Sequence, residues 1–405
     1  GGPSQTETFD PKMTAPAGVR SVTGEVKTTL PGVTYGATFQ KLARLAHKLA
    51  VVRSFTTGNA NHDIKPIVCK ETLGANLGSL YARVAGTNHP VSGMPRNVAL
   101  FPRAVEPKSQ ERQTQFGKFD STGFLGPAYT PFIPGGGGDL QQDMLLNLPR
   151  GRLGDRRGLL SKLDNLKKSL DGNSGGLDRF REQAFEALLG GAGDAFDLSK
   201  EDPKVVERYD TAPLVPPSQI GKQWNNYNFY VDNARTLGKL MLMARRLCER
   251  GCGFVTVTTN FVWDMHADVN NATVQEGMRY CGLPFDHAVS TFLQDVEERG
   301  LRDDILLVAC GEMGRTPKLN ARGGRDHWGG IAPLLLSGGG LNTGQVIGES
   351  NHDASLPAAD PITNKDLVST ILHYLFNVEE LRVTQGIPTE LIRLTESGTP
   401  IRALF

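Results

Sequence analysis

The chain is poor in cysteine, has almost no net charge and lacks long apolar runs. Its 405 residues include only five cysteines, and the formal net charge is +1. The odd cysteine count and the absence of a C-x-x-C pair argue against a disulfide framework and a thiolate metal site. The balanced charge gives no general attraction to nucleic acid or to a membrane surface. No apolar run reaches the roughly 18 residues of a transmembrane helix, so we expect no membrane span.

What is present is an alternation of helical and strand-like segments, separated by loops rich in the 47 glycines. Helical apolar spacing and short apolar runs follow one another along the chain, at 38–49, 50–52, 71–84, 159–189, 230–250, 253–259, 285–299, 304–310, 332–337 and 365–376. This order predicts an α/β fold with a mostly parallel central sheet covered by helices. We expect one domain over residues 1–405, with irregular and helical insertions at 86–228.

The first residues read as the continuation of an earlier element. Gly1-Gly2-Pro3-Ser4 is typical of a loop that leaves a strand. We therefore expect a first core strand that precedes Gly1 and is missing from this sequence. The rest of residues 1–35 reads as extended loop.

Two apolar runs end at residues that bind metals. Gly253–Thr259 leads to Asp264 and His266, and Ile305–Ala309 leads to Glu312. In open α/β sheets, ligands bind beyond the carboxyl ends of the strands. A carboxylate is rarely buried there unless it is paired or coordinates a metal. We expect one shared metal site, although a surface salt bridge at Asp264 and His266 would give the same pattern.

The segment after Glu312 adds further candidates. Arg315 offers a planar donor fork that suits a phosphate or sulfate group, unless it only pairs with Glu312. Asp326 and His327 lie in a glycine-rich loop. We expect His327 to be a metal ligand and Asp326 to be a ligand or the partner that orients it.

A third strand exit, after residues 50–52, is rich in reactive side chains. Thr56 and Thr57 are candidate hydroxyl nucleophiles, and Asn61 and His62 are candidate polar partners in catalysis and substrate binding. A capped turn would use the same residue types.

Near the start of the chain, Glu7 and Asp10 could complete a second metal site, with Lys12 as a substrate-binding residue; an ordinary polar loop is the alternative. Carboxylates and imidazoles without thiolates suit zinc, manganese, magnesium or iron. Two such ions would clamp a phosphate or sulfate ester.

Five motifs together resemble the domain-of-unknown-function family 1501, from Gly1 to about Ile401: GGPSQTETFDPK, WDMHAD, GEMGRTPKLN, GGRDHW and LLLSGGGL. That family is placed in the alkaline phosphatase superfamily, with sulfatases and cofactor-independent phosphoglycerate mutases. The resemblance implies an alkaline phosphatase-like fold with helices on both faces of the sheet. It also implies export to the periplasm or the cell exterior, because members usually carry a twin-arginine signal.

The superfamily plan can be carried over only in part. It implies metal ligands and a nucleophile at the Glu7/Asp10 region, Thr56 or Thr57, Asp264, His266, Glu312 and His327. Met313 stands where alkaline phosphatases carry a histidine, and residue 7 is Glu where the family usually has Asp. No C/S-x-P-x-R signature follows Val52.

The leading hypothesis is a metal-dependent hydrolase of phosphate or sulfate esters, acting on a small molecule or a glycan, in which Arg315 steadies the anion. The alternative is a non-catalytic exported protein of the same fold that binds a glycan or a protein. A phosphomutase-type transferase would use the same metal site. The sequence leaves the oligomeric state open.

Overall fold

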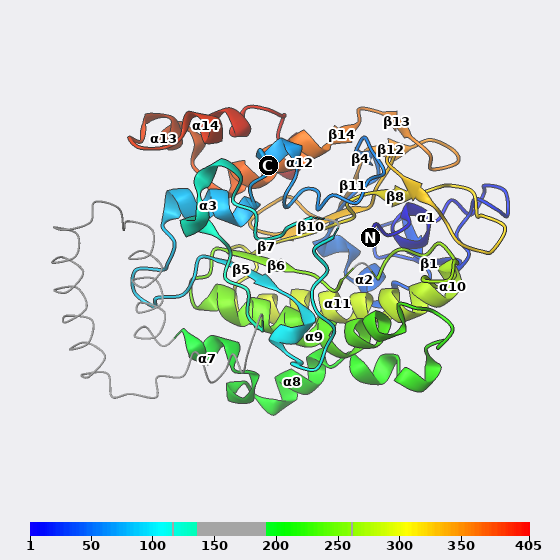
Figure 1. Cartoon of the computed structure of the whole chain (residues 1–405). Helices are drawn as coiled ribbons and strands as arrows, with labels where there is room; N and C mark the ends of the chain where they lie inside the picture. The colour runs from blue at the N-terminus through cyan, green and yellow to red at the C-terminus, as the bar shows by residue number, and fades with distance from the viewer. Residues whose placement is uncertain (116, 136–191, 261) are drawn as a thin grey trace.

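The computed structural model describes residues 1–115, 117–135, 192–260 and 262–405 (Figure 1). The helical segment expected at 159–189 and the middle of the expected insertions at 86–228 lie outside the described residues.

The largest sheet has four strands in the order β11-β3-β10-β7. These are β11 (Gln345–Ile347), β3 (Ala50–Val52), β10 (Leu334–Gly338) and β7 (Leu306–Cys310). β10 runs antiparallel to both β3 and β7, whereas β11 is parallel to β3. Every residue of β10 is buried, as its mainly apolar sequence predicts for a strand covered on both faces.

The prediction of a mostly parallel central sheet flanked by helices was wrong. The sheets are small and scattered, and two of the three pairings in the largest one are antiparallel. The chain between β7 and β10 explains the reversal. A parallel return needs a long crossover, usually a helix. Here the segment instead forms a short antiparallel pair, β8 (Gly314–Arg315) and β9 (His327–Trp328), so β10 returns antiparallel to β7.

The remaining sheets have two strands each. Their pairs are β1 (Glu25–Lys27) with β2 (Thr34–Gly36), β4 (Phe55–Thr56) with β14 (Ile362–Thr363), β5 (Asn97–Leu100) with β6 (Phe254–Val257), and β12 (Glu349–Ser350) with β13 (Pro357–Ala359). The β5–β6 and β4–β14 pairs are parallel.

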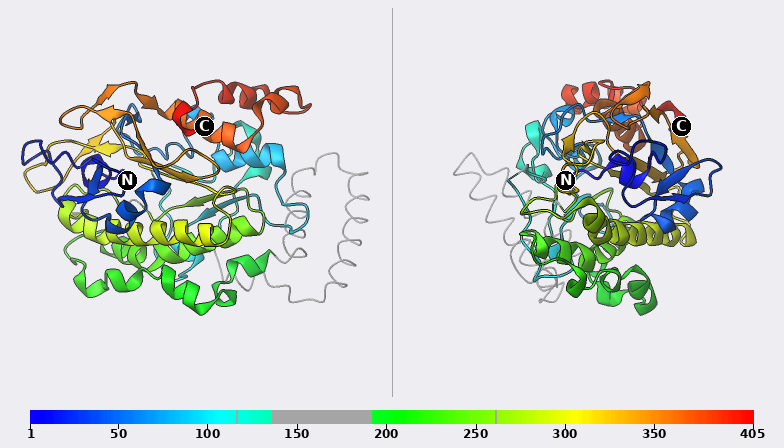
Figure 2. Two further views of the ribbon diagram at one scale, coloured as in Figure 1. Left: turned by 180° about the vertical axis from the view of Figure 1, so that it is seen from behind. Right: turned by 90° about the vertical axis from the view of Figure 1, so that its right-hand side faces the viewer.

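Two long helices cover one side of these strands. They are α9 (Tyr227–Glu249) and α11 (Leu283–Glu298), which pack on each other (Figure 2). In α9, the side chains of Tyr230, Leu237 and Met241 recur at helical spacing and are buried in the largest hydrophobic cluster. The C-terminal helices α12 (Asn364–Leu375), α13 (Val378–Val383) and α14 (Thr389–Thr395) lie on the opposite side and help to bury the second cluster.

The start of α12 shows how a local sequence signal sets a boundary. Its N-cap is Thr363. The Thr363 hydroxyl and the Asp366 carboxylate each bond the other's backbone N–H, which forms a capping box.

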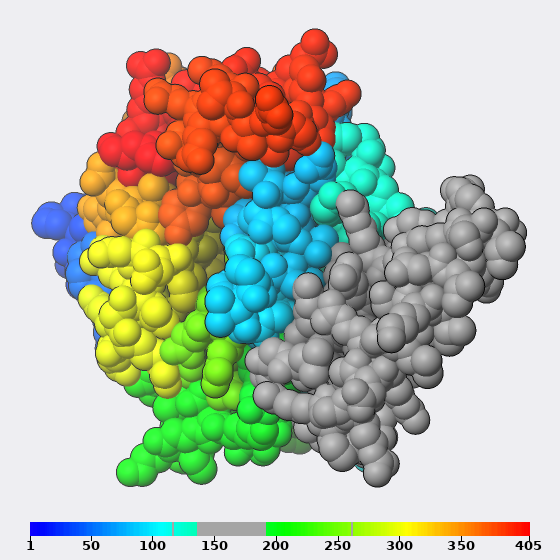
Figure 3. Space-filling view, turned by 90° about the vertical axis from the view of Figure 1, so that its left-hand side faces the viewer, coloured from blue at the N-terminus to red at the C-terminus, as the bar shows by residue number. Residues whose placement is uncertain are grey.

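The other α-helices are shorter. They are α1 (Gln5–Thr8), α2 (Gln40–Arg44), α3 (Leu77–Ala85), α7 (Gly193–Phe196), α8 (Pro203–Tyr209) and α10 (Val274–Gly277). The segment around α3 lies at the surface between the C-terminal helices and the segment that holds α9 (Figure 3). Within the described residues, no helix is both long and apolar enough to cross a bilayer, in agreement with the sequence.

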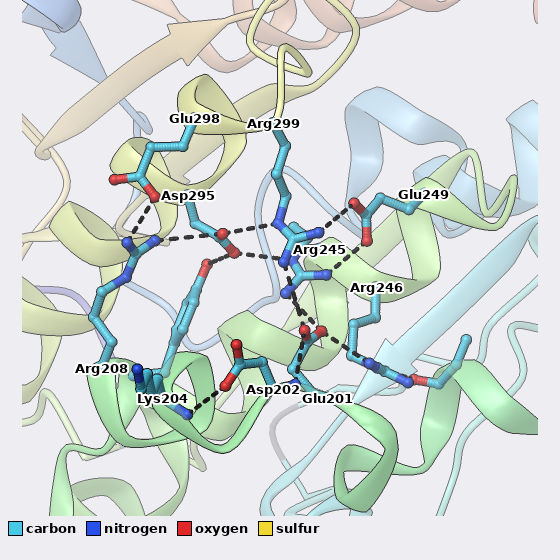
Figure 4. Close-up of polar contacts among 12 residues, drawn as sticks. Glu201, Asp202, Lys204, Arg208, Arg245, Arg246, Glu249, Asp295, Glu298 and Arg299 are labelled. Atoms are coloured by element: carbon cyan, nitrogen blue, oxygen red, sulfur yellow. Dashed lines mark hydrogen bonds and ion pairs between the residues drawn. The ribbon is translucent and has the colours of Figure 1, made fainter.

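A buried ion network joins α9 and α11 to the segment before α8 (Figure 4). Arg245 is 1% exposed, and its guanidinium contacts Asp295 at 2.9 Å, Glu201 at 2.8 Å and Glu249 at 2.6 Å. Arg299 adds a second cation at 2.9 Å from the Asp295 carboxylate. The charges are therefore matched, as burial of an arginine requires.

Candidate metal centre

Four segments that are far apart in the sequence meet at one end of β6 and β7. His62 comes from the loop after β4, Asp264 from the segment after β6, Glu312 from the residue pair after β7, and His327 from β9. The His62 loop lies tightly against the chain after β9. A Cβ atom added to Gly329 would lie 2.5 Å from the backbone carbon of Asn59, so only glycine allows this approach.

His62, Asp264 and His327 form the centre of the site. One ligand atom from each residue lies within 4.8 Å of the other two. Nε2 of His62 is 3.2 Å from Oδ2 of Asp264, and Nε2 of His327 is 3.5 Å from Oδ1 of the same carboxylate. Two imidazoles and one carboxylate are a donor set that suits zinc and other divalent transition metals.

His266 directs its own Nε2 at this centre, 2.9 Å from Nε2 of His327. His327 Nδ1 lies 3.1 Å from the Ala60 carbonyl, which can only accept, so Nδ1 carries the hydrogen. His266 Nδ1 likewise lies 3.2 Å from an Asp326 carboxylate oxygen. In its neutral form, each ring therefore presents a lone pair at Nε2. Two facing lone pairs call for a cation between them, and the residues present fit a metal ion.

Glu312 reaches the centre through His62. Its Oε1 atom lies 2.9 Å from His62 Nδ1 and 3.1 Å from the amino group of Gly1. Burial favours a raised pKa for the Glu312 carboxyl, but in the chain 1–405 the Gly1 amino group and His62 outweigh burial and lower that pKa. A carboxylate in this place fixes the orientation of the His62 ring, which leaves Nε2 toward Asp264.

Arg315 neutralises the Asp264 carboxylate from the other side. The guanidinium is 1% exposed, and its Nη2 donates to Asp264 Oδ1. Its Nε donates to the Gly2 carbonyl at 2.6 Å, and its Nη1 donates to His266 Nε2 at 3.3 Å. Burial favours a raised pKa for Asp264, but in the chain 1–405 the Gly1 amino group and Arg315 hold that pKa well below its usual range.

The charge on Arg315 also acts on His266. Burial and the neighbouring guanidinium lower the pKa of the His266 imidazole. The ring is therefore neutral at neutral pH, which is the form that binds a metal ion.

Five residues that the sequence placed in one site are thus brought together with His62: Asp264, His266, Glu312, Arg315 and His327. Asp326 is at the rim, where its half-exposed carboxylate orients His266. The sequence missed Asn320, which donates to the His266 carbonyl at 2.9 Å and to Asp326 at 3.3 Å. Its place between Arg315 and His327 in the chain was the only available signal.

The threonines expected as nucleophiles have their hydroxyls engaged elsewhere. Thr56 donates to the Gly329 carbonyl at 2.9 Å, and Thr57 donates to the Asn59 carbonyl at 3.1 Å. Asn61 is exposed, and its backbone N–H donates to the Asn59 side chain. These contacts hold the loop that carries His62. They correspond to the capped turn that was the alternative interpretation of this segment.

The acidic residues near the start of the chain are held apart from the metal centre. Asp10 contacts Lys12 at 3.3 Å and Arg53 at 3.6 Å, and Ser350 donates to it. Lys12 also donates to the Ser350 carbonyl.

Glu7 is fully buried beside Arg325, at 3.2 Å. It also accepts hydrogen bonds from Ser21, Val22 and Thr23. The structure therefore places Glu7 in a structural ion pair.

Comparison with known proteins gives a family and no activity. No curated protein and no solved structure matches the chain. A family model described as "Protein of unknown function (DUF1501)" matches residues 1–405. The whole length of the match shows that the chain belongs to the DUF1501 family.

Proposed function

We propose that this protein is a metal-dependent hydrolase of phosphate or sulfate esters. The observation that supports the proposal is the approach of ligand atoms from His62, Asp264 and His327 to within 4.8 Å of one another. His266 is a fourth candidate ligand because its Nε2 atom lies 2.9 Å from that of His327. A divalent ion in this set would supply Lewis acidity toward an ester oxygen. The described residues form one such set, so the proposal is for a single ion.

Arg315 is the group that would recognise the anion. Its Nη1 atom donates to His266 Nε2, which is also a candidate ligand. When His266 gives that lone pair to an ion, Nη1 loses its acceptor and can donate to an anionic oxygen of the ester. The other donors of Arg315 stay with Asp264 and the Gly2 carbonyl, so the guanidinium is already oriented.

Two further parts of the proposal rest on motif resemblance alone. They are membership of the alkaline phosphatase and sulfatase superfamily, and export to the periplasm or the cell exterior.

The test combines elemental analysis with an ester screen. We expect the purified chain to bind about one equivalent of zinc, manganese or iron. The His62→Ala and His327→Ala variants should bind it more than about 100-fold more weakly, because loss of a direct ligand exceeds the 10- to 100-fold cost of losing an outer-shell partner. His373→Ala is the matched control, because His373 lies on α12 and bonds the Ser369 carbonyl. Turnover of p-nitrophenyl phosphate or p-nitrophenyl sulfate should fall with metal content in the same variants. Equal metal content in His327→Ala and His373→Ala would overturn the proposal.

A further inference from the structure

A cleft of about 770 Å³ separates β6 from β7. Its two long walls are residues 253–260 and 303–312, which contain these strands and continue beyond both of their ends. The floor includes Leu237, Met241 and Ala244 of α9. The lining is thus mainly apolar, and it reaches Glu312 at the metal centre.

The facing edges of both strands lack a partner among the described residues. β6 pairs with β5 along one edge, and β7 pairs with β10 along one edge. In such pairs, alternate residues direct their N–H and C=O groups to the opposite edge. Those groups face the cleft from both sides. Burial of a backbone group without a partner is unfavourable, and a purely apolar ligand would leave both rows unsatisfied.

The burial of β7 differs from that of its neighbour β10. All five residues of β7 are half-buried, although their sequence is Leu-Leu-Val-Ala-Cys, whereas all five residues of β10 are buried. An apolar strand that has one paired edge and remains half-exposed lacks a neighbour on its other edge.

The amino terminus lies at the end of this cleft where both strands finish. Asp264 and Glu312, which follow β6 and β7, meet there at His62, so the two strands point the same way. Gly1 and Pro3 line the cleft at that end. The Gly1 amino group lies 3.1 Å from Glu312, and the Gly2 carbonyl is held by Arg315. A strand that ran between β6 and β7, parallel to both, would therefore finish at Gly1.

We propose that the cleft holds an extended apolar strand that pairs with β6 on one edge and with β7 on the other and that continues into Gly1. Its length would be about seven residues at about 3.3 Å per residue, to match the walls of the cleft. It would lack the alternation of a half-exposed strand, because α9 lies on one side of it and the lining of the cleft is mainly apolar.

The test adds such a strand to the chain. One version carries seven alternating valine and isoleucine residues in front of Gly1, and the matched control has the same extension with three prolines in place of alternate residues. Hydrogen–deuterium exchange is read by mass spectrometry on peptides that cover β6 and β7, with α12 as internal reference. We expect the valine–isoleucine extension to slow exchange in β6 and β7 at least about tenfold, and the proline control to leave it unchanged. Equal exchange in all versions would overturn the proposal.

The same peptide supplied separately covers the case in which the extended chain fails to fold. At millimolar concentration it should slow exchange in β6 and β7 of the chain 1–405, less strongly than the attached strand because it lacks the effective concentration of a linked segment. Protection by the free peptide but not by a well-folded extension would overturn the continuation into Gly1. Protection by an apolar dye such as anilinonaphthalene sulfonate, with none from either peptide form, would overturn the strand and assign the cleft to a small molecule.

Discussion

His266 and His327 point their Nε2 atoms at each other across 2.9 Å, while each ring engages a hydrogen-bond acceptor through Nδ1. The two acceptors are a carboxylate oxygen of Asp326 and the carbonyl oxygen of Ala60. Both place the hydrogen of a neutral ring on Nδ1. In this form, both Nε2 atoms present lone pairs that can bind a cation. Because Asp326 is at the rim, the role of His266 as a ligand can be tested without disturbing the buried core.

Asp326→Asn should weaken metal binding 10- to 100-fold without altering stability. The carboxylate orients His266 and increases its basicity, and both effects weaken when the charge is removed. The Asp326 side chain is 56% exposed, so folding should be unaffected. Isothermal titration with zinc checks this, with Asp360→Asn as the control at another exposed aspartate. Unchanged zinc affinity in Asp326→Asn would show that His266 is not a ligand.

Asp264→Ala should destabilise the metal-free protein by about 3–5 kcal/mol, because it leaves the buried Arg315 charge without its carboxylate. The double variant Asp264→Ala, Arg315→Met should recover part of that loss. Urea unfolding of the wild type, both single variants and the double variant measures the coupling. If the single variant is as stable as the wild type, then Arg315 is neutralised by another group. Loss of activity in Asp264→Ala therefore needs the His327 variant beside it before it is assigned to metal binding.

Arg245→Ala should cost about 3–5 kcal/mol of stability and leave metal content unchanged. It removes the cation that Asp295, Glu201 and Glu249 share, and Asp295 is buried. Arg382→Ala is the matched control, because the Arg382–Glu396 pair is half-exposed on both sides and should contribute less than about 1 kcal/mol. Similar unfolding midpoints in urea for the two variants would contradict a structural role for the network.

Asp286 should make the protein less stable as pH rises from about 4 to about 6. Burial raises the pKa of its carboxyl to about 6, although the backbone N–H groups of Lys41 and Leu42 donate to it. The folded state therefore holds the proton more tightly than the unfolded state. The stabilisation is complete below the unfolded pKa and is lost as pH rises through the folded value, a change of roughly 3 kcal/mol.

Asp286→Asn removes this titration. Urea unfolding at several pH values between 4 and 7 should show that the stability of the wild type relative to the variant falls across that window. A constant difference between the two proteins would mean that Asp286 titrates normally. Asp264 and Glu312, whose pKa values are lowered, act in the opposite direction in both proteins and cancel in the comparison.

The sequence identified side chains that the structure brings together, but it did not predict the sheet that carries them. Glu312 and Asp264 were visible because a carboxylate in the segment that follows an apolar strand has few structural uses. The strand directions were not visible. β3 has three residues and β7 has five, so each carries too little pattern to show its direction. The reversal before β10 depends on a hairpin of two-residue strands, β8 and β9, inside a loop rich in glycine and charge.

The roles of the other site residues could not be predicted because they depend on contacts between distant parts of the chain. The role of Asp10 depends on Arg53 and Ser350, and neither contact leaves a local signal. Glu312 was expected to bind the metal or to pair with Arg315, yet its carboxylate contacts His62. The sequence could name reactive side chains at strand ends, but only the folded chain shows which of them meet.

The candidate ligands come from parts of the chain that have little else in common. Even Glu312, which orients His62, lies 250 positions from it in the chain. The His62 loop follows Phe55 of one hydrophobic cluster, and Asp264 precedes Met265 of the other. An ion held between them would act as a reversible cross-link that closes very long loops in the unfolded chain, much as a disulfide does. The availability of the metal would then control the resistance of the folded protein to proteases as well as the proposed hydrolase activity.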